Sequence, residues 1–133
     1  MKKGSPAGQN PGTASPAISP QQVADLVNGA LDDAKAVDIQ TIDVRGKTTI
    51  TDYMIVASGN STRHVKTLAD SVITRSKERG MPVVGVEGER ESEWILVDLA
   101  DVLVHLMVPR ARAFYALESL WTVDDEAAAE ATP

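Results

Sequence analysis

Carboxylates are closely spaced in two stretches of the sequence. Four glutamates alternate with other residues, and two aspartates flank a short turn: Glu87, Glu89, Glu91, Glu93, Asp98 and Asp101. Paired carboxylates that converge from rigid elements can hold Mg²⁺ for phosphoryl transfer. The glutamates share their segment with Gly88 and Ser92, where alternate side chains can simply face water. Aspartates at a tight turn can cap that turn locally, so Asp98 and Asp101 have both a structural and a functional interpretation.

A polar junction, residues 58–61, joins an apolar run to a predicted helix. Its sequence is Ser-Gly-Asn-Ser. Backbone N–H groups at a helix N-terminus attract anions, so the junction could cradle a phosphate. One glycine does not make a phosphate loop, however. The pattern favours a turn in which Ser61 caps the helix.

The two histidines have no obvious catalytic partners. His64 lies in the first turn of the second predicted helix, and His105 lies inside an apolar strand. Neither shows a metal-ligand spacing or a nucleophile nearby. Strand alternation places His105 on one face with Leu103 and Met107. It is either a satisfied structural residue or, if exposed among those apolar neighbours, part of a contact with a partner.

The two tryptophans can be core residues or interface anchors. A tryptophan in a small, aromatic-poor domain is most often buried, yet tryptophan is also a preferred anchor at interfaces. Trp94 begins a strand beside the acidic segment and is expected to be half exposed. Trp121 closes the last predicted helix and is expected to be packed.

Caps and periodicity give the elements that position these side chains. Ser19, Pro20 and Gln22 predict the start of a first helix with a capping box. A second helix follows residue 61 and ends at Gly80 and Pro82. Strands are predicted over residues 39–44, 53–57, 83–86, 94–97 and 102–107. A last helix opens at residue 109, and its predicted inner side is Phe114, Leu117, Leu120 and Trp121. This order of helix, two strands, helix, three strands and helix predicts one α/β or α+β sheet domain.

Composition sets the boundaries of that domain. The 133 residues are 43% hydrophobic and 4% aromatic, with no cysteine. A core of aliphatic side chains is therefore expected, without disulfides or thiolate metal sites. Residues 1–17 are poor in large apolar side chains and predict a disordered tail. Residues 122–133 predict a flexible acidic tail, which leaves residues 18–121 as the domain.

Charge and hydropathy bear on the location and the partner. No apolar run approaches the roughly 20 residues that cross a bilayer, and no hydrophobic stretch follows the first lysines as in a signal peptide. A cytoplasmic protein is expected. The net charge of −6 lacks the basic footprint of nucleic-acid binding. An acidic domain is better matched to a basic protein partner.

Several short motifs, in order along the chain, carry a resemblance to a known family. They span about residues 23–121 and include Asp38-Ile39, residues 51–59 (TDYMIVASG), residues 61–65 (STRHV), residues 86–88 (VEG), residues 94–102 (WILVDLADV), Val104-His105 and residues 112–121 (RAFYALESLW). No single piece is specific, but their order and spacing together are. The chain resembles the ribosomal silencing factor, or Iojap-like, family.

The resemblance implies both a fold and an activity. The implied fold is a nucleotidyltransferase-like domain, a mixed sheet with flanking helices, without a working active site. Relatives would bind the L-fourteen protein of the large (50S-type) ribosomal subunit, block its joining to the small subunit and form homodimers. The residues agree with a non-enzyme: a nucleotidyltransferase needs an Asp-x-Asp or Asp-x-Glu pair after its Gly-Ser turn, whereas Asp70 stands alone there. No cofactor and no metal ion are expected.

Three functions follow from this reading. The first is a translational repressor that occludes the large subunit; the others are a large-subunit assembly adaptor and a nucleotidyl or phosphoryl transferase. For the first, the expected contact surface combines an aromatic anchor, apolar side chains and carboxylates for arginine or lysine on the partner. Its predicted members are Trp94, Asp98, Leu99, Asp101, Val102 and His105.

Overall fold

The computed structural model describes the backbone of residues 18–115 and the side chains of residues 18–112. Its elements are α1 (Pro20–Asp33), β1 (Val37–Asp43), β2 (Tyr53–Ser58), α2 (Thr62–Glu78), β3 (Gly85–Glu87), β4 (Trp94–Asp98), β5 (Val102–Met107) and α3 (Pro109–Tyr115). The predicted order of elements is therefore confirmed. The predicted tails, and the predicted packing of Phe114, Leu117, Leu120 and Trp121, lie outside the described residues or side chains.

Local capping determines where the two long helices begin. Ser19 accepts a hydrogen bond from the Gln22 amide, and the Gln22 side chain accepts one from the Ser19 amide. This reciprocal pair is the predicted capping box, and it satisfies amides that a helix start leaves unpaired. Ser61 likewise accepts a hydrogen bond from the amide of His64 at the start of α2.

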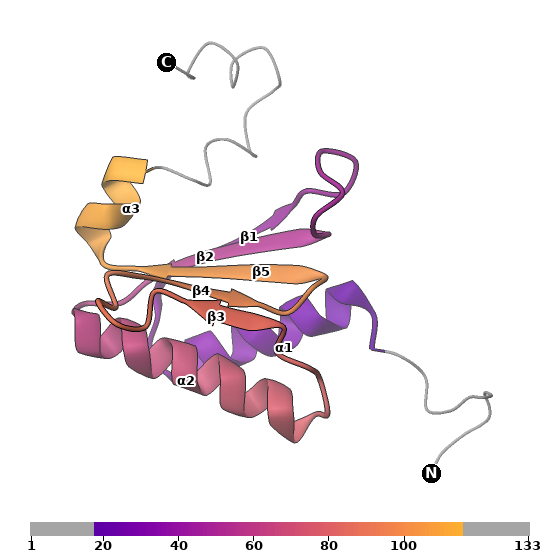
Figure 1. Cartoon of the computed structure of the whole chain (residues 1–133), viewed down its shortest axis with the longest axis horizontal. Coiled ribbons are helices and arrows are strands. Elements are labelled where there is room, and N and C mark those ends of the chain that lie inside the picture. The colour runs from indigo at the N-terminus through magenta and orange to yellow at the C-terminus, as the bar shows by residue number, and fades with distance from the viewer. Residues whose placement is uncertain (1–17, 116–133) are drawn as a thin grey trace, which may run out of the picture.

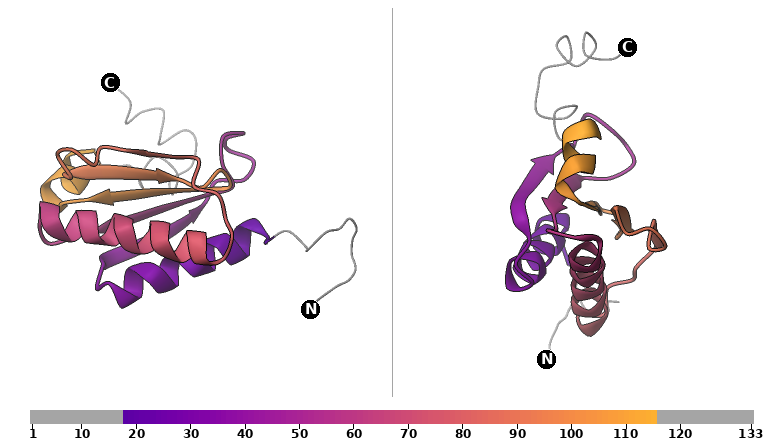
Figure 2. Two further views of the ribbon diagram at one scale, coloured as in Figure 1. Left: turned by 60° about the horizontal axis from the view of Figure 1, so that its bottom comes forward. Right: turned by 90° about the vertical axis from the view of Figure 1, so that its left-hand side faces the viewer.

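The five strands form one mixed sheet in the order β1-β2-β5-β4-β3. β2 and β5 run parallel, whereas the other neighbouring pairs are antiparallel. All six residues of β2 are buried, as its continuous apolar run predicts for a strand covered on both faces. Figures 1 and 2 show α1 and α2 together below one face of the sheet, and α3 on the other side at the end of β5.

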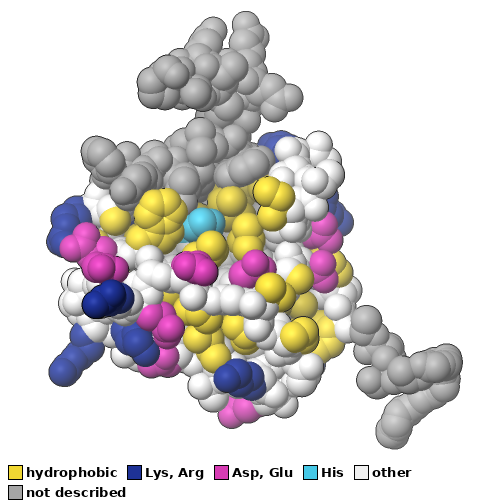
Figure 3. Space-filling view, in the orientation of Figure 1, with side chains coloured by type: hydrophobic (Ala, Val, Ile, Leu, Met, Phe, Trp, Pro, Cys, Tyr) yellow, Lys and Arg dark blue, Asp and Glu magenta, His cyan; other side chains and the backbone are white. Residues whose placement is uncertain are grey.

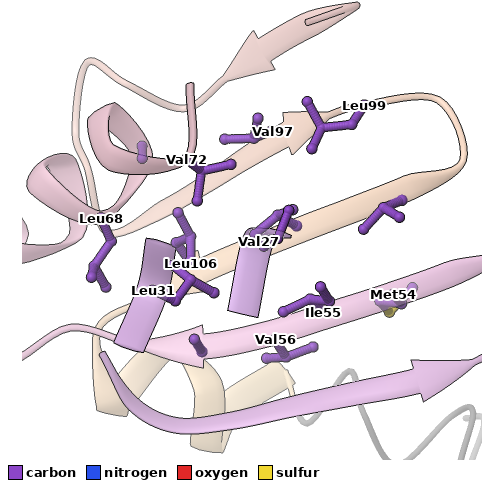
Figure 4. Packing of buried hydrophobic residues seen from close by; sticks show 14 of the residues in the cluster. Val27, Leu31, Met54, Ile55, Val56, Leu68, Val72, Val97, Leu99 and Leu106 are labelled. Atoms are coloured by element: carbon purple, nitrogen blue, oxygen red, sulfur yellow. The ribbon is translucent and has the colours of Figure 1, made fainter. Parts of the chain in front are cut away.

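The main core lies between the sheet and the two long helices. Val27 and Leu31 of α1 and Leu68 and Val72 of α2 are fully buried, and Figure 4 shows them directed toward the sheet. The core is almost wholly aliphatic, as the low aromatic content predicts. No helix within residues 18–115 is long and apolar enough to cross a membrane.

A buried arginine connects α3 to strands β1 and β2. Arg112 is 7% exposed, and its Nη1 donates to the Asp38 carbonyl at 2.6 Å and to Ser58 Oγ at 3.1 Å. Its Nη2 lies 3.5 Å from the Asp38 carboxylate. These contacts join α3 to β1 and β2, so the described part of α3 has a defined position beside the strands.

Candidate functional site

One face of β4 and β5 is turned away from α1 and α2. Along β4, Ile95 and Val97 are fully buried, whereas their neighbours in the strand are partly exposed. The register of β4 and β5 aligns the partly exposed side chains with alternate residues of β5. We call this surface the Trp94 face and define it as Trp94, Leu96, Asp98, Leu103 and His105. Figure 3 shows hydrophobic side chains gathered around a histidine on this side of the molecule, with acidic side chains beside them.

A hydrogen bond fixes the two ring side chains of the Trp94 face. Trp94 Nε1–H donates to His105 Nδ1 at 3.0 Å, and the ring centroids lie 5.8 Å apart. His105 must be neutral to accept this bond, so its hydrogen is on Nε2. Burial lowers the pKa of His105 to about 4, because the charged form loses its hydration. The pair therefore keeps one protonation state near neutral pH.

A hollow of about 240 Å³ opens on the same face. It is lined by Glu87, Gly88, Trp94, Leu96 and His105. Strand register explains this grouping, because Glu87 pairs with Leu96 and Leu96 pairs with His105. Gly88 closes one wall: its φ is +90°, and a Cβ there would collide with the Trp94 carbonyl oxygen. Only glycine permits this close approach.

The four glutamates of the acidic segment differ in their partners. Glu89 lies 3.8 Å from Lys66, and Glu93 forms a 2.7 Å ion pair with Arg110. Within residues 18–112, Glu87 and Glu91 form no ion pair. All four glutamates are exposed, as expected of side chains that face water, and Ser92 is buried where its amide and hydroxyl donate to the carbonyls of Gly88 and Glu89.

The two aspartates of the turn between β4 and β5 make different contacts. Asp98 Oδ1 accepts a 2.8 Å hydrogen bond from the Ala100 amide, which is the local capping expected of aspartate at a turn. Asp101 is exposed at the start of β5. Leu99 is 6% exposed and Val102 is 0% exposed. Both apolar side chains belong to the core, so the predicted contact surface loses these two members in this conformation.

The junction before α2 is already occupied by protein contacts. The Gly59 amide donates to the Met107 carbonyl, and the Asn60 amide donates to His64 Nδ1 at 2.9 Å. His64 Nε2 lies 2.9 Å from the Ala34 carbonyl, so the imidazole bridges α1 and the junction. These two amides are unavailable to a phosphate. Among the described residues, no group of three His, Asp or Glu side chains could hold a metal ion.

Comparison with known proteins agrees with this fold. The family model described as ribosomal silencing factor during starvation matches residues 17–132. The chain belongs to the ribosomal silencing factor family. The match runs past residue 121, where we expected the resemblance to end.

Silencing factors of several bacteria match most of the chain. The factor of Chromobacterium violaceum is 46% identical over 101 residues, which are 76% of this chain and 83% of that protein. The factor of Zymomonas mobilis is 38% identical over 121 residues, or 91% of each protein. A crystal structure of a Chromobacterium violaceum protein superposes with a TM-score of 0.77 at 43% identity, covering 80% of this chain and 89% of that one.

One relative is a mitochondrial protein whose name differs from those of the bacterial relatives. The mouse protein called mitochondrial assembly of ribosomal large subunit protein 1 is 36% identical over 110 residues. The match covers 78% of this chain and 48% of the mouse protein, so it extends over about half of the mouse protein. The names of the relatives thus point to the ribosome and, in the mouse protein, to its large subunit.

Three residues of the hollow were not among those predicted for the contact surface, although Glu87 was named among the candidate carboxylates. Leu96 could have been found, because strand alternation places it on the same face as Trp94 and Asp98. Glu87 and Gly88 could not, since their place beside Leu96 depends on the register between β3 and β4. Of the predicted contact surface, Trp94, Asp98 and His105 come together on the Trp94 face.

Proposed function

We propose that this chain is a cytoplasmic translational repressor that binds the large ribosomal subunit and blocks its joining to the small subunit, without catalysis. The observation that carries the proposal is the Trp94 face. It combines a half-buried tryptophan held by a hydrogen bond with partly exposed leucines and adjacent carboxylates. Such a combination is typical of an interface anchor surrounded by charged groups.

The partner that fits this face is a basic surface of a large-subunit ribosomal protein. Family membership supports the ribosome, and the net charge of −6 favours a positively charged partner. We propose the L-fourteen protein, following the family resemblance, as the contact. Occlusion then requires only that the bound chain overlap the joint between the subunits.

Sedimentation of ribosomal subunits tests this proposal directly. Purified large and small subunits are mixed with and without the chain under joining conditions and separated on a sucrose gradient. The chain should sediment with large subunits, and the peak of joined ribosomes should fall. No binding to large subunits would refute the proposal.

The name of the mouse relative favours a second candidate, an adaptor in large-subunit assembly. Both functions require binding to the large subunit, but only repression requires a loss of joining. If the chain binds large subunits and the joined peak is unchanged, the assembly function replaces repression.

Replacing Asp101 with lysine should weaken binding to large subunits about fivefold. Asp101 is exposed at the margin of the Trp94 face, and its carboxylate makes no hydrogen bond to another described residue, so the fold should be unaffected. Titration of labelled chain with large subunits measures the effect. Asp32→Lys on α1 is the matched control, because it makes the same charge change in the helix layer and should leave affinity nearly unchanged. An equal loss of affinity in both variants would show that the net charge, and not the position of Asp101, causes the effect.

A further inference from the structure

The hollow on the Trp94 face combines apolar walls with one carboxylate. Leu96 and the Trp94 ring provide apolar surface, and Glu87 lies at the edge strand beside them. Neighbouring strands are about 4.8 Å apart, so Glu87 and His105 lie at opposite ends of a row that crosses three strands. We also refer to this hollow as the slot; it has apolar walls and one acidic end.

Glu87 is the acidic side chain that lines the slot. Two other glutamates of the acidic segment have cations nearby. Lys66 lies near Glu89 and Arg110 is paired with Glu93. Within residues 18–112, no cation pairs with Glu87. A partner that covered the slot with an apolar side chain would remove water from this carboxylate without replacing its interactions, which is costly.

At its other end, the slot carries no positive charge near neutral pH. His105 accepts the hydrogen bond from Trp94 and is therefore neutral. A cation in the slot meets one carboxylate, a tryptophan ring and aliphatic surface. Arginine and lysine match this arrangement, because their long aliphatic stems pack on apolar surface while the charged end reaches an acidic group.

We propose that the hollow lined by Glu87, Gly88, Trp94, Leu96 and His105 receives one arginine or lysine side chain of the partner, with the cation at Glu87 and the stem against Leu96 and Trp94. This assignment rests on the proposed function, since it names what the Trp94 face recognises. It makes Glu87 a specificity-determining residue that the sequence alone does not reveal.

The decisive experiment compares Glu87→Gln with Glu91→Gln in the full chain, titrated with large ribosomal subunits at several salt concentrations. Both changes remove one negative charge from the same segment, and neither glutamate forms an ion pair within the described side chains. Glutamine at position 87 keeps a hydrogen-bond acceptor but loses the charge. Glu87→Gln should weaken binding roughly tenfold and flatten its salt dependence, whereas Glu91→Gln should have little effect.

The other outcomes separate the two levels of inference. If the unmodified chain does not bind large subunits, the proposed function fails. If the unmodified chain binds and the two variants behave alike, the assignment of a cation to the hollow is wrong while the proposed function stands. A small loss in Glu87→Gln with unchanged salt dependence would also overturn the assignment, because that result fits a neutral hydrogen-bond donor in the slot.

Discussion

Replacing Trp94 with alanine should weaken binding of the chain to large ribosomal subunits about 30-fold, which is about 2 kcal/mol. Trp94 is partly exposed at one end of the Trp94 face, and its ring is held by the hydrogen bond to His105. A side chain fixed before binding loses little conformational entropy when the partner covers it. The truncation would also remove one wall of the hollow.

Stability must be measured beside affinity, because Trp94 also contacts the core. Trp94→Ala leaves His105 Nδ1 without its donor, and an unsatisfied buried acceptor costs about 1–3 kcal/mol. Trp94→Phe separates the two effects, since it keeps an aromatic ring but loses Nε1–H. We expect Trp94→Phe to lose part of the stability and less of the affinity than Trp94→Ala. A lower melting temperature with undiminished affinity in Trp94→Ala would show that Trp94 is a core residue only.

Local sequence rules predicted the elements well. The capping box at Ser19 and Gln22 and the cap at Ser61 depend on residues within one helical turn, so they can be read directly. The continuous apolar run of β2 likewise predicts a strand covered on both faces. β5 was predicted with its observed bounds, Val102–Met107. These features need no information about distant parts of the chain.

The contact surface was harder to predict, because β5 is apolar on both faces. Alternation separates His105 from Val102 but does not say which face α1 and α2 cover. Packing decides this, and Val102 is fully buried. Leu99 was expected on the surface as a turn residue. Its side chain is buried, in a turn where Ala100 has a φ of +69° and Asp98 caps the Ala100 amide.

The acidic segment shows a second limit of sequence reasoning. Its four glutamates look equivalent in the sequence, and alternation alone suggests a solvated loop. The structure distinguishes them by distant contacts: Lys66 is on α2, Arg110 is on α3, and Glu87 joins the hollow through the pairing of β3 with β4. Such contacts depend on sheet order, which a single sequence does not state.

Lowering the pH from about 7 to about 4.5 should reduce the free energy of unfolding by about 2 kcal/mol through His105 alone. Burial lowers the pKa of this histidine from 6.5 to about 4 in the folded chain. Between these two values the unfolded chain binds a proton that the folded chain does not. The free energy of unfolding therefore falls as the pH drops through this window. Below the window both states are protonated at His105, so this residue causes no further decrease.

The variant His105→Asn isolates this contribution. Asparagine does not titrate, and its amide oxygen can take the place of Nδ1 as the acceptor for Trp94 Nε1–H. Denaturant unfolding of both proteins at the two pH values gives the difference in their stabilities. Carboxylates that titrate in the same window are common to both proteins, so they cancel in that difference. A stability difference that does not change with pH would contradict a lowered pKa. A decrease in the stability of the unmodified chain relative to the variant would instead show that the Trp94 face depends on a neutral His105.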